Sequence, residues 1–458
     1  MYRVGTVAQF IKTAKVIIIM KPIIHPFSLF ALCLSLPASA QILPPTIGIP
    51  GTPSLNSIQR DIERNVPRDL ARPQVINDVV DTSNDATATL LNTLPATLPI
   101  IGRDGKTALT EMTDGSGYRA VAREWIVEVN PQQLDRLRTQ GITILSQNHY
   151  AALGIHTVRI RVDEQTDHLS ALKTLLSDAP DEAINRNYIY APERKVDPIT
   201  VDTTEHSDTA AICQQPVKIG IIDTAIRTDH PALQQAAIQQ RTFLNPDLAP
   251  ASAHGTAIVG LLVGHSNAIA PLVPNASLYS ASVFYARDGF SQGATLDSLL
   301  DAMQWLAEQP LTVINMSLAG PPSPLLHRAI QAMTQRGISV VAAVGNDGPA
   351  SPPLYPAAYP ETVAVTAVDH HNAIYRWAIQ GKHVDFAALG VGVITARGLN
   401  EEGPESGTSI AAPLVTAKIA CLDTQIDISQ RKSALAKHAF DLGEPGRDTV
   451  FGEGLLHR

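Results

Sequence analysis

The chain has 458 residues, a formal net charge of −8 and a hydrophobic share of 45%. This length exceeds that of a typical single domain, so we expect two or more domains with a sizeable apolar core. The acidic balance and the lack of any run of five or more basic residues argue against a nucleic-acid partner.

Residues 1–40 have the pattern of a secretion signal. Basic residues up to Lys21 precede an apolar stretch at 27–36, and residues 38–40 are Ala-Ser-Ala, the small-x-small pattern that signal peptidase cuts. A start at Met20 would give this signal a more ordinary length. We therefore expect a secreted or periplasmic protein. Because no later apolar stretch is long enough to cross a bilayer, no membrane anchor is predicted.

Residues 41–117 are rich in Pro, Thr, Asn and Asp and show little apolar periodicity. Such a composition buries too little apolar surface to offset the entropy that ordering costs. We expect this segment to be mostly flexible, and the sequence does not indicate its role.

Residues 118–195 are predicted to form a small α+β domain. Alternating and helically spaced apolar residues indicate the order strand, helix, strand, strand, helix, strand. The predicted strands are 125–129, 142–145, 156–162 and 183–190, and the predicted helices are 131–140 and 169–176. This order is typical of the split βαβ, or ferredoxin-like, fold. Residues 196–215 follow as a linker.

Residues 216–458 are predicted to form a doubly wound α/β domain. Short apolar strands alternate with helices, which favours a mostly parallel sheet covered on both faces. The predicted strands are 217–222, 277–283, 312–316, 338–344 and 362–368, and the predicted helices include 295–307, 324–336 and 410–422. Ligand sites of such folds lie at the carboxyl ends of the strands.

Three residues far apart in this domain have the types that a nucleophilic serine requires. Asp223 ends an apolar strand, His254 begins an apolar helix, and Ser409 begins another helix. A serine hydroxyl is a weak nucleophile, so an imidazole must take its proton and a carboxylate must orient the imidazole. Taken singly, each residue fits an ordinary turn, loop or helix cap. Taken together and in this order, they predict a catalytic triad.

A fourth candidate, Asn346, lies in a turn that follows the predicted strand 338–344. A side-chain amide in this turn can donate a hydrogen bond to the oxyanion that forms during acyl transfer. The amino end of the helix that Ser409 begins also favours negative charge. By itself, Asn346 would be an ordinary turn residue.

The motifs around these residues resemble those of the subtilisin-like serine proteases, or subtilases. They are Asp-Thr from Asp223, His-Gly-Thr from His254, Ala-Val-Gly-Asn up to Asn346, and Gly-Thr-Ser-Ile-Ala-Ala-Pro at 407–413, in that order. The resemblance covers the whole predicted α/β domain. It implies Asp223 as orienter, His254 as general base and acid, Ser409 as nucleophile and Asn346 as oxyanion donor.

Two short segments are expected to bind the substrate. The first follows the predicted strand 312–316 and consists of Ser317, Leu318, Ala319 and Gly320. Its backbone is free to pair with an extended peptide, and in the family substrate residues before the cleaved bond lie here; a plain strand-to-helix loop is the alternative. The second segment consists of Ala343, Val344 and Gly345. Together the two segments are expected to form the walls of a pocket for the substrate residue before the cleaved bond. A pocket with Leu354 at its base would prefer an apolar or small residue, whereas Asp347 at its rim would favour a basic residue.

The position of the small α+β domain, directly before the α/β domain, resembles that of the inhibitory prodomain of subtilases. The resemblance implies a tail that lies in the substrate cleft of the same chain and is cut by the enzyme itself. An independent small domain with no bearing on the protease is the alternative.

No metal or cofactor is predicted. The loop 264–274 is nearly free of carboxylates, whereas calcium prefers about six to eight oxygen ligands. His370 and His371 are adjacent, so their side chains do not share a face that would bind a metal.

Two cysteines, Cys213 and Cys421, remain after the predicted signal is removed. Export would allow them to pair. The helix from Ser409 to Cys421 has about the length of the strand that ends at Asp223, which would bring the two cysteines near each other. Two unpaired, small hydrophobic residues are the alternative.

The sequence therefore predicts a secreted serine endopeptidase that acts on protein or peptide substrates and is inhibited in cis by its own prodomain. A catalytically silent subtilase-like binding or scaffold protein is an alternative of a different class. A peptidyl transferase, in which an amine takes the acyl group instead of water, is a further alternative that the sequence does not separate from hydrolysis.

Overall fold

The computed structural model describes residues 97–177, 179–192, 210–287, 292–398, 401–423 and 426–458. The predicted signal, most of the segment 41–117 and most of the predicted linker therefore lie outside the described residues. Within these described ranges, no helix combines the length and the apolar character needed to cross a membrane.

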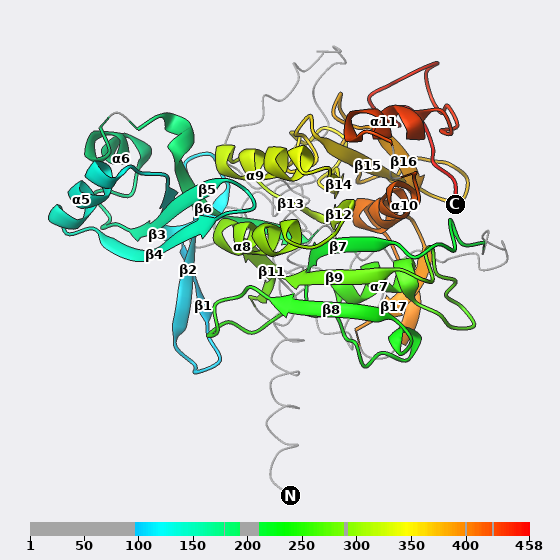
Figure 1. Cartoon of the computed structure of the whole chain (residues 1–458), viewed down its shortest axis with the longest axis horizontal. Helices are drawn as coiled ribbons and strands as arrows, with labels where there is room; N and C mark the ends of the chain where they lie inside the picture. Colours follow the sequence, from blue (N-terminus) through cyan, green and yellow to red (C-terminus); the bar gives the residue numbers. More distant parts are fainter. Residues whose placement is uncertain (1–96, 178, 193–209, 288–291, 399–400, 424–425) are drawn as a thin grey trace, which may run out of the picture. The chain divides into compact units, whose positions relative to one another are not determined.

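The α/β part contains a seven-stranded sheet in the order β16-β15-β14-β12-β7-β9-β8 (Figure 1). The strands are β7 (Lys218–Asp223), β8 (Ala237–Thr242), β9 (Ser277–Ser282), β12 (Val313–Met316), β14 (Ser339–Ala343), β15 (Thr362–Val368) and β16 (Phe386–Leu389). All neighbouring strands run parallel. β12, β14 and β15 are buried along their whole length, as expected for apolar strands that are covered on both faces.

Helices cover both faces of this sheet. They are α7 (His254–Val263), α8 (Leu296–Ala307), α9 (Pro324–Gln335), α10 (Thr408–Ala420) and α11 (Ile428–Ala436). Val340 and Ala342 of β14 pack in one apolar cluster with α8 and α9, whereas Val341 packs in a second cluster with α7 and α10. A hairpin of β17 (Val393–Arg397) and β18 (Glu401–Glu405) packs on α7. The predicted doubly wound α/β fold is confirmed.

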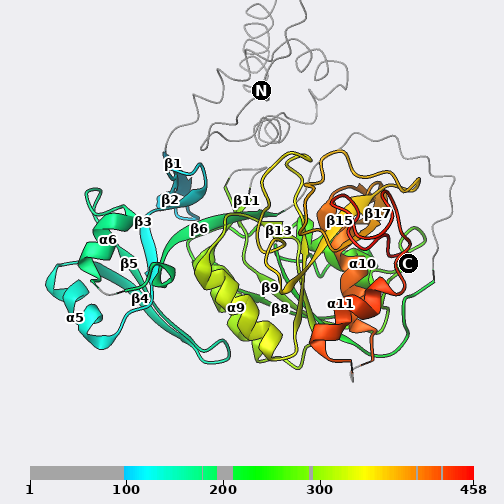
Figure 2. The same cartoon turned by 90° about the horizontal axis from the view of Figure 1, so that it is seen from above.

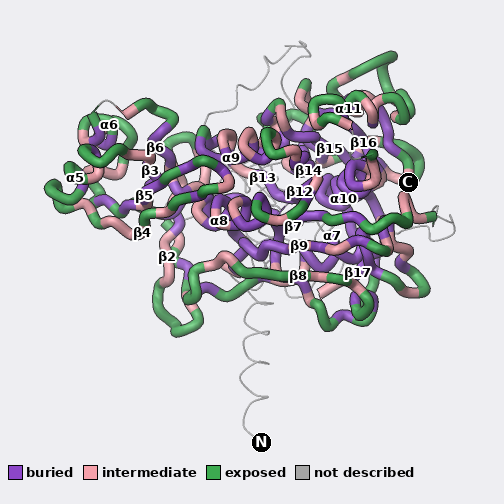
Figure 3. The backbone as a smooth tube through the Cα atoms, in the orientation of Figure 1, coloured by how far each residue is buried: buried purple, intermediate pink, exposed green. Residues whose placement is uncertain are grey.

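Residues 119–192 form the small α+β fold (Figure 2). Its elements are β3 (Arg119–Val127), α5 (Pro131–Thr139), β4 (Thr143–Tyr150), β5 (Ile155–Arg161), α6 (Leu169–Leu175) and β6 (Ile184–Pro192). The strands pair antiparallel in the order β4-β5-β3-β6. Trp125, Leu137 and Leu172 belong to a separate apolar cluster that joins the helices to the strands. Figure 3 shows exposed residues along both helices of this fold, buried residues along the central strands β12, β14 and β15 of the parallel sheet, and exposed residues along its edge strand β8.

The chain just before this fold is ordered, contrary to the expectation of flexibility for 41–117. β1 (Thr97–Ile101) and β2 (Thr107–Thr113) form an antiparallel hairpin, and β2 pairs with β3. Ile100 is buried in a cluster with Tyr285 of the α/β part. The expectation was wrong for this hairpin because its stabilising contacts come from distant residues, which the local composition does not reveal.

The last strand of the small fold also pairs with strands of the α/β part. These strands are β10 (Tyr285–Ala286), β11 (Gln292–Thr295) and β13 (Leu318–Ala319). β6 pairs antiparallel with β11, which pairs with β10, and its final residues Ala191 and Pro192 pair antiparallel with β13. The end of β6 therefore lies as an added strand on the segment that the sequence predicts to bind substrate.

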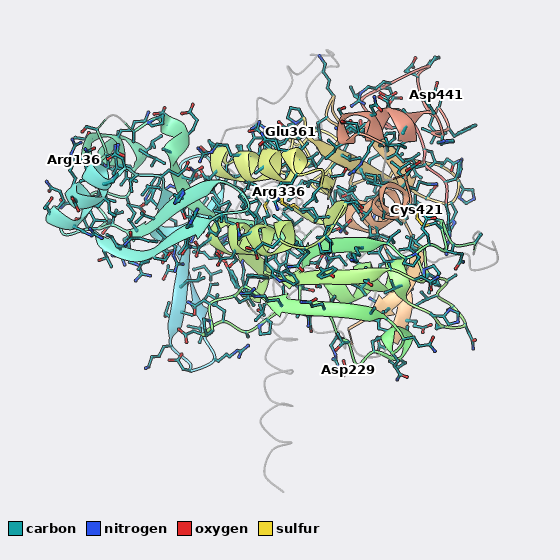
Figure 4. The ribbon with its side chains drawn as sticks, viewed as in Figure 1. Arg136, Asp229, Arg336, Glu361, Cys421 and Asp441 are labelled. Atoms are coloured by element: carbon teal, nitrogen blue, oxygen red, sulfur yellow. A yellow bond between two sulfur atoms is a disulfide. The ribbon has the colours of Figure 1, made fainter. Side chains whose placement is uncertain are left out.

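Cys213 and Cys421 form a disulfide bond, so they are not two unpaired hydrophobic residues. Cys421 directly follows the last residue of α10 as its C-cap (Figure 4), and Cys213 lies shortly before β7. The two cysteines are 208 positions apart, so the bond closes a long loop that contains all strands of the parallel sheet.

Replacing both cysteines by serine (C213S/C421S) is expected to lower the free energy of unfolding by about 2–5 kcal/mol, because the unfolded chain regains the entropy of the open loop. Denaturation in guanidinium chloride, followed by tryptophan fluorescence, measures this loss. A reducing agent should destabilise the wild type to the same extent and leave the double variant unchanged. Equal midpoints for oxidised wild type and variant would contradict a stabilising role.

Candidate active site

Asp223 and His254 are in direct contact at the carboxyl edge of the parallel sheet. Asp223 is the last residue of β7, and His254 is the first residue of α7. His254 Nδ1 lies 2.8 Å from Asp223 Oδ1 and 2.9 Å from Oδ2. Both side chains are buried. The contact with the carboxylate fixes the orientation of the ring and determines that Nδ1 is the nitrogen that carries the proton.

The second ring nitrogen, His254 Nε2, is buried and has no hydrogen-bond partner among the described residues. A neutral imidazole that donates from one nitrogen accepts at the other. Since Nδ1 lies against the carboxylate, Nε2 is the nitrogen that can take a proton from a hydroxyl group.

Ser409 is the second residue of α10, and its side chain is fully buried. α10 packs against α7 and against the strands β12, β14, β15 and β16. Ser409 O accepts a hydrogen bond of 3.1 Å from Ser317 Oγ, which lies just beyond the carboxyl end of β12. α10 and α7 therefore both begin at the carboxyl edge of the same sheet.

Asn346 is tied to the first residue of α10. Its Oδ1 accepts hydrogen bonds from Thr408 N at 3.0 Å and from Thr408 Oγ1 at 3.1 Å. Thr408 Oγ1 in turn accepts a hydrogen bond of 3.2 Å from Gly345 N. The amide oxygen of Asn346 thus faces Thr408, and the neighbouring residue in the chain is Ser409. The local sequence around Thr408 does not indicate this role, because the contacts of Thr408 join distant segments.

Thr224 connects the strand of Asp223 to the helix of His254. Its backbone N–H donates to Asp223 Oδ1 at 2.6 Å, and its Oγ1 accepts from Gly255 N at 2.8 Å. A Cβ atom at Gly255 would lie 2.6 Å from Thr224 O, so this close approach requires glycine after the histidine. The motif residue Thr224, which the sequence analysis left without a role, thus holds the acid and the imidazole in register.

The two helices of the site begin without a side-chain cap of the usual kind. Their N-cap residues, Ala253 and Gly407, make no capping side-chain hydrogen bond, whereas a polar side chain caps each of α5, α6, α8, α9 and α11. Thr224 and Asn346, from neighbouring loops, accept one amide each instead. The first-turn amides give this edge of the sheet a positive potential, which favours an anion.

The segment 317–320 lies beside the end of β6. Leu318 and Ala319 form β13, which pairs antiparallel with the last two residues of β6. A Cβ atom at Gly320 would lie 2.4 Å from Tyr190 Cδ1, so glycine leaves room for the buried tyrosine ring. The backbone of this segment therefore accommodates an extended strand.

Ala343, Val344 and Gly345 are buried where β14 ends. Gly345 has a φ of +108°, which residues with a side chain rarely adopt. A Cβ atom there would lie 2.8 Å from Ile379 Cδ1 and 3.1 Å from Leu354 Cδ1. Leu354, which the sequence analysis placed at this pocket, and Ile379, which it missed, thus form an apolar surface against Gly345.

Within the described ranges, no group of three or more His, Cys, Asp or Glu side chains is arranged to hold a metal ion. His370 and His371 are both exposed. Asp223 and Asn346 lie at and just beyond the carboxyl ends of β7 and β14, and His254 and Ser409 lie at the amino ends of α7 and α10.

A family model described as the subtilase family matches residues 214–454 of this chain. The chain is 33% identical to subtilisin BL of Lederbergia lenta over 245 residues, which cover 53% of this chain and 88% of that protein. It is 33% identical to the minor extracellular protease Epr of Bacillus subtilis (strain 168) over 254 residues, which cover 54% of this chain.

A third relative, the alkaline protease of Alkalihalobacillus alcalophilus, is 32% identical over 245 residues. The matched region spans 38% of the Epr protease and 63% of this alkaline protease. Both shares are below two thirds, so the likeness to these two proteins concerns one region of each.

The contact between Thr224 and Gly255 yields a stability prediction. Thr224→Val keeps the shape of the side chain but removes the acceptor of a buried amide, so it is expected to lower the free energy of unfolding by about 1–3 kcal/mol. Thr224→Ser, which keeps the hydroxyl, is the matched control and should lose less. Urea unfolding of the three proteins compares them, and a Thr224→Val variant as stable as wild type would contradict a stabilising role of the hydrogen bond.

Proposed function

The chain belongs to the subtilase family, and from this premise we propose that it is a secreted or periplasmic serine endopeptidase. The observation that carries the proposal is the buried contact of His254 Nδ1 with both oxygens of Asp223, at the edge where the helix of Ser409 begins. A carboxylate, an imidazole and an alcohol in this arrangement suit acyl transfer.

In the proposed reaction, Ser409 Oγ attacks the carbonyl carbon of the peptide bond while His254 Nε2 takes the hydroxyl proton. The tetrahedral intermediate collapses when the carbon–nitrogen bond breaks and His254 returns the proton to the leaving amine. Water then attacks the acyl-enzyme, with His254 again as the base, and releases the acid. Asp223 stays ionised and stabilises the charged ring.

We assign the oxyanion to the side-chain amide of Asn346 and to the amino end of α10. Thr408 accounts for the orientation of the amide, since it donates two hydrogen bonds to Asn346 Oδ1. A donor of this kind contributes about 100- to 1,000-fold to turnover in enzymes that form tetrahedral intermediates. The uncapped first turn of α10 adds a positive potential at the same place.

We further propose that residues 97–192, called the pro-segment below, inhibit the protease in cis. The support is the antiparallel pairing of Ala191 and Pro192 with β13, because an extended substrate would use the same backbone edge. The maturation cut would lie beyond the end of β6, within the predicted linker 196–215 and near Gln215. This proposal extends the predicted prodomain 118–195 toward the amino terminus, so that it includes the hairpin β1–β2.

Ser409→Ala is expected to accumulate as an uncut precursor that a serine-directed phosphonate does not label. Wild type should be labelled and should lose everything before about residue 215. The physical reason is that the pro-segment is joined in cis, so the same nucleophile performs the cut. Ser433→Ala, at an exposed serine of α11, is the control and should behave as wild type. Intact-protein mass spectrometry measures both labelling and cutting.

The two results separate the alternatives. If the phosphonate does not label the wild type, the alternative of a catalytically silent binding or scaffold protein is favoured. Equal cutting of wild type and Ser409→Ala would mean that another protease matures the chain.

Cleavage of a peptide library is expected to occur after apolar or small residues, because Leu354 and Ile379 form an apolar surface at Gly345. Product masses measure this preference and show whether water or an amine takes the acyl group. Predominant cleavage after lysine or arginine would contradict the expectation and would point to Asp347 as the residue that sets the preference.

A further inference from the structure

The hairpin β1–β2 contacts the α/β part at a place apart from the peptide-binding edge. Ile100 of β1 is buried in a cluster with Leu248 and Tyr285. In the turn that follows β1, Arg103 N donates a hydrogen bond of 2.8 Å to Asp247 O. These contacts lie on β10 and on the loop between β8 and α7, whereas the end of β6 lies on β13.

Glu111 of β2 is the polar centre of this contact. It is fully buried, and its Oε1 accepts hydrogen bonds from Tyr285 Oη at 2.7 Å and from Arg287 Nε at 2.5 Å. Its Oε2 accepts one of 2.5 Å from Arg119 Nε of the pro-segment. The carboxylate thus joins one arginine from each side of the contact.

Charge explains why this acid is ionised although it is buried. Burial alone would raise the pKa of Glu111, but the guanidinium groups of Arg287 and Arg119 and the hydroxyl of Tyr285 outweigh it, and the pKa is lowered. Removing one member of such a buried, hydrogen-bonded set leaves the other charges without a partner, which weakens an interface strongly.

We propose that the β1–β2 hairpin is an anchor that keeps the pro-segment bound after the maturation cut, with Tyr285 and Arg287 as the surface of the protease that recognises Glu111. The proposal rests on the proposed function, because it presumes a protease that cuts and then retains its own pro-segment.

The two contacts differ in how a substrate affects them. The end of β6 is held on β13 by main-chain pairing of two residues, which any extended peptide can imitate. The hairpin is held by an acidic side chain and an apolar residue at a place that a peptide in the cleft does not occupy. Substrate therefore competes with the first contact and not with the second. The pairing of β6 with β11 and the contacts of Asn185 with α9 and Arg159 with α8 also remain, so the hairpin adds to contacts that set how long the inhibited complex lasts.

Glu111→Gln in the full chain tests this anchor. The variant keeps the shape of the side chain and removes its charge, so the pro-segment should leave faster once the cut is made. Two quantities are followed in one time course: the cut, on denaturing gels, and hydrolysis of a short chromogenic peptide. The delay between them is expected to shorten at least about 10-fold. Because Glu111 leaves with the pro-segment, the final activity per released protease molecule must equal that of wild type.

The matched control is Asp104→Asn, which removes one negative charge from the exposed turn of the same hairpin. It should leave the delay unchanged. Arg287→Gln should shorten the delay as Glu111→Gln does, and the double variant should be no faster than the faster single one, because both changes break one interaction.

An unchanged delay in Glu111→Gln, or an equal shortening in Asp104→Asn, would overturn the anchor. If Glu111→Gln is not secreted, Arg287→Gln decides, and a delay equal to that of wild type overturns it. Failure of the proposed function looks different, since the wild type itself would then neither cut nor hydrolyse the peptide.

Discussion

The contact between the carboxylate of Asp223 and the ring of His254 is the interaction on which the site depends. Both groups are buried, and a buried carboxylate without a partner is costly. The parallel sheet keeps the cost low because it brings the end of β7 and the start of α7 to the same edge. Thr224 then secures the pair from both sides, since it donates to the acid and accepts from the residue after the histidine.

The start of α10 is held in a similar way from a neighbouring strand. Asn346, beyond the end of β14, accepts the first amide of α10, as Thr224 accepts an amide of α7. In both cases a loop residue replaces the usual N-cap side chain. The consequence is that the loops and helices that carry the proposed nucleophile, base and oxyanion donor are fixed to one another by hydrogen bonds, so that little reorganisation is needed when charge develops.

The pro-segment uses two kinds of contact with different physical properties. Main-chain pairing of β6 with β13 tolerates many sequences, which would suit the proposed substrate-binding role of this edge. The buried cluster around Glu111 depends on particular side chains and is therefore selective. Dividing the tasks in this way would let one segment block the cleft without requiring that the cleft itself bind it tightly.

The sequence by itself determined the α/β fold class and the central strands of the parallel sheet, because apolar periodicity is a local property that strands and helices express residue by residue. It also placed the acid, the imidazole, the alcohol and the amide in a recognisable order. It did not indicate the edge strands β8 and β16. Only the tertiary structure decided that the polar stretch before residue 118 contains a hairpin, that Cys213 pairs with Cys421, and that Thr224 and Thr408 hold the site. Each of these depends on a contact between segments far apart in the chain, and such contacts follow from packing as a whole rather than from any local pattern.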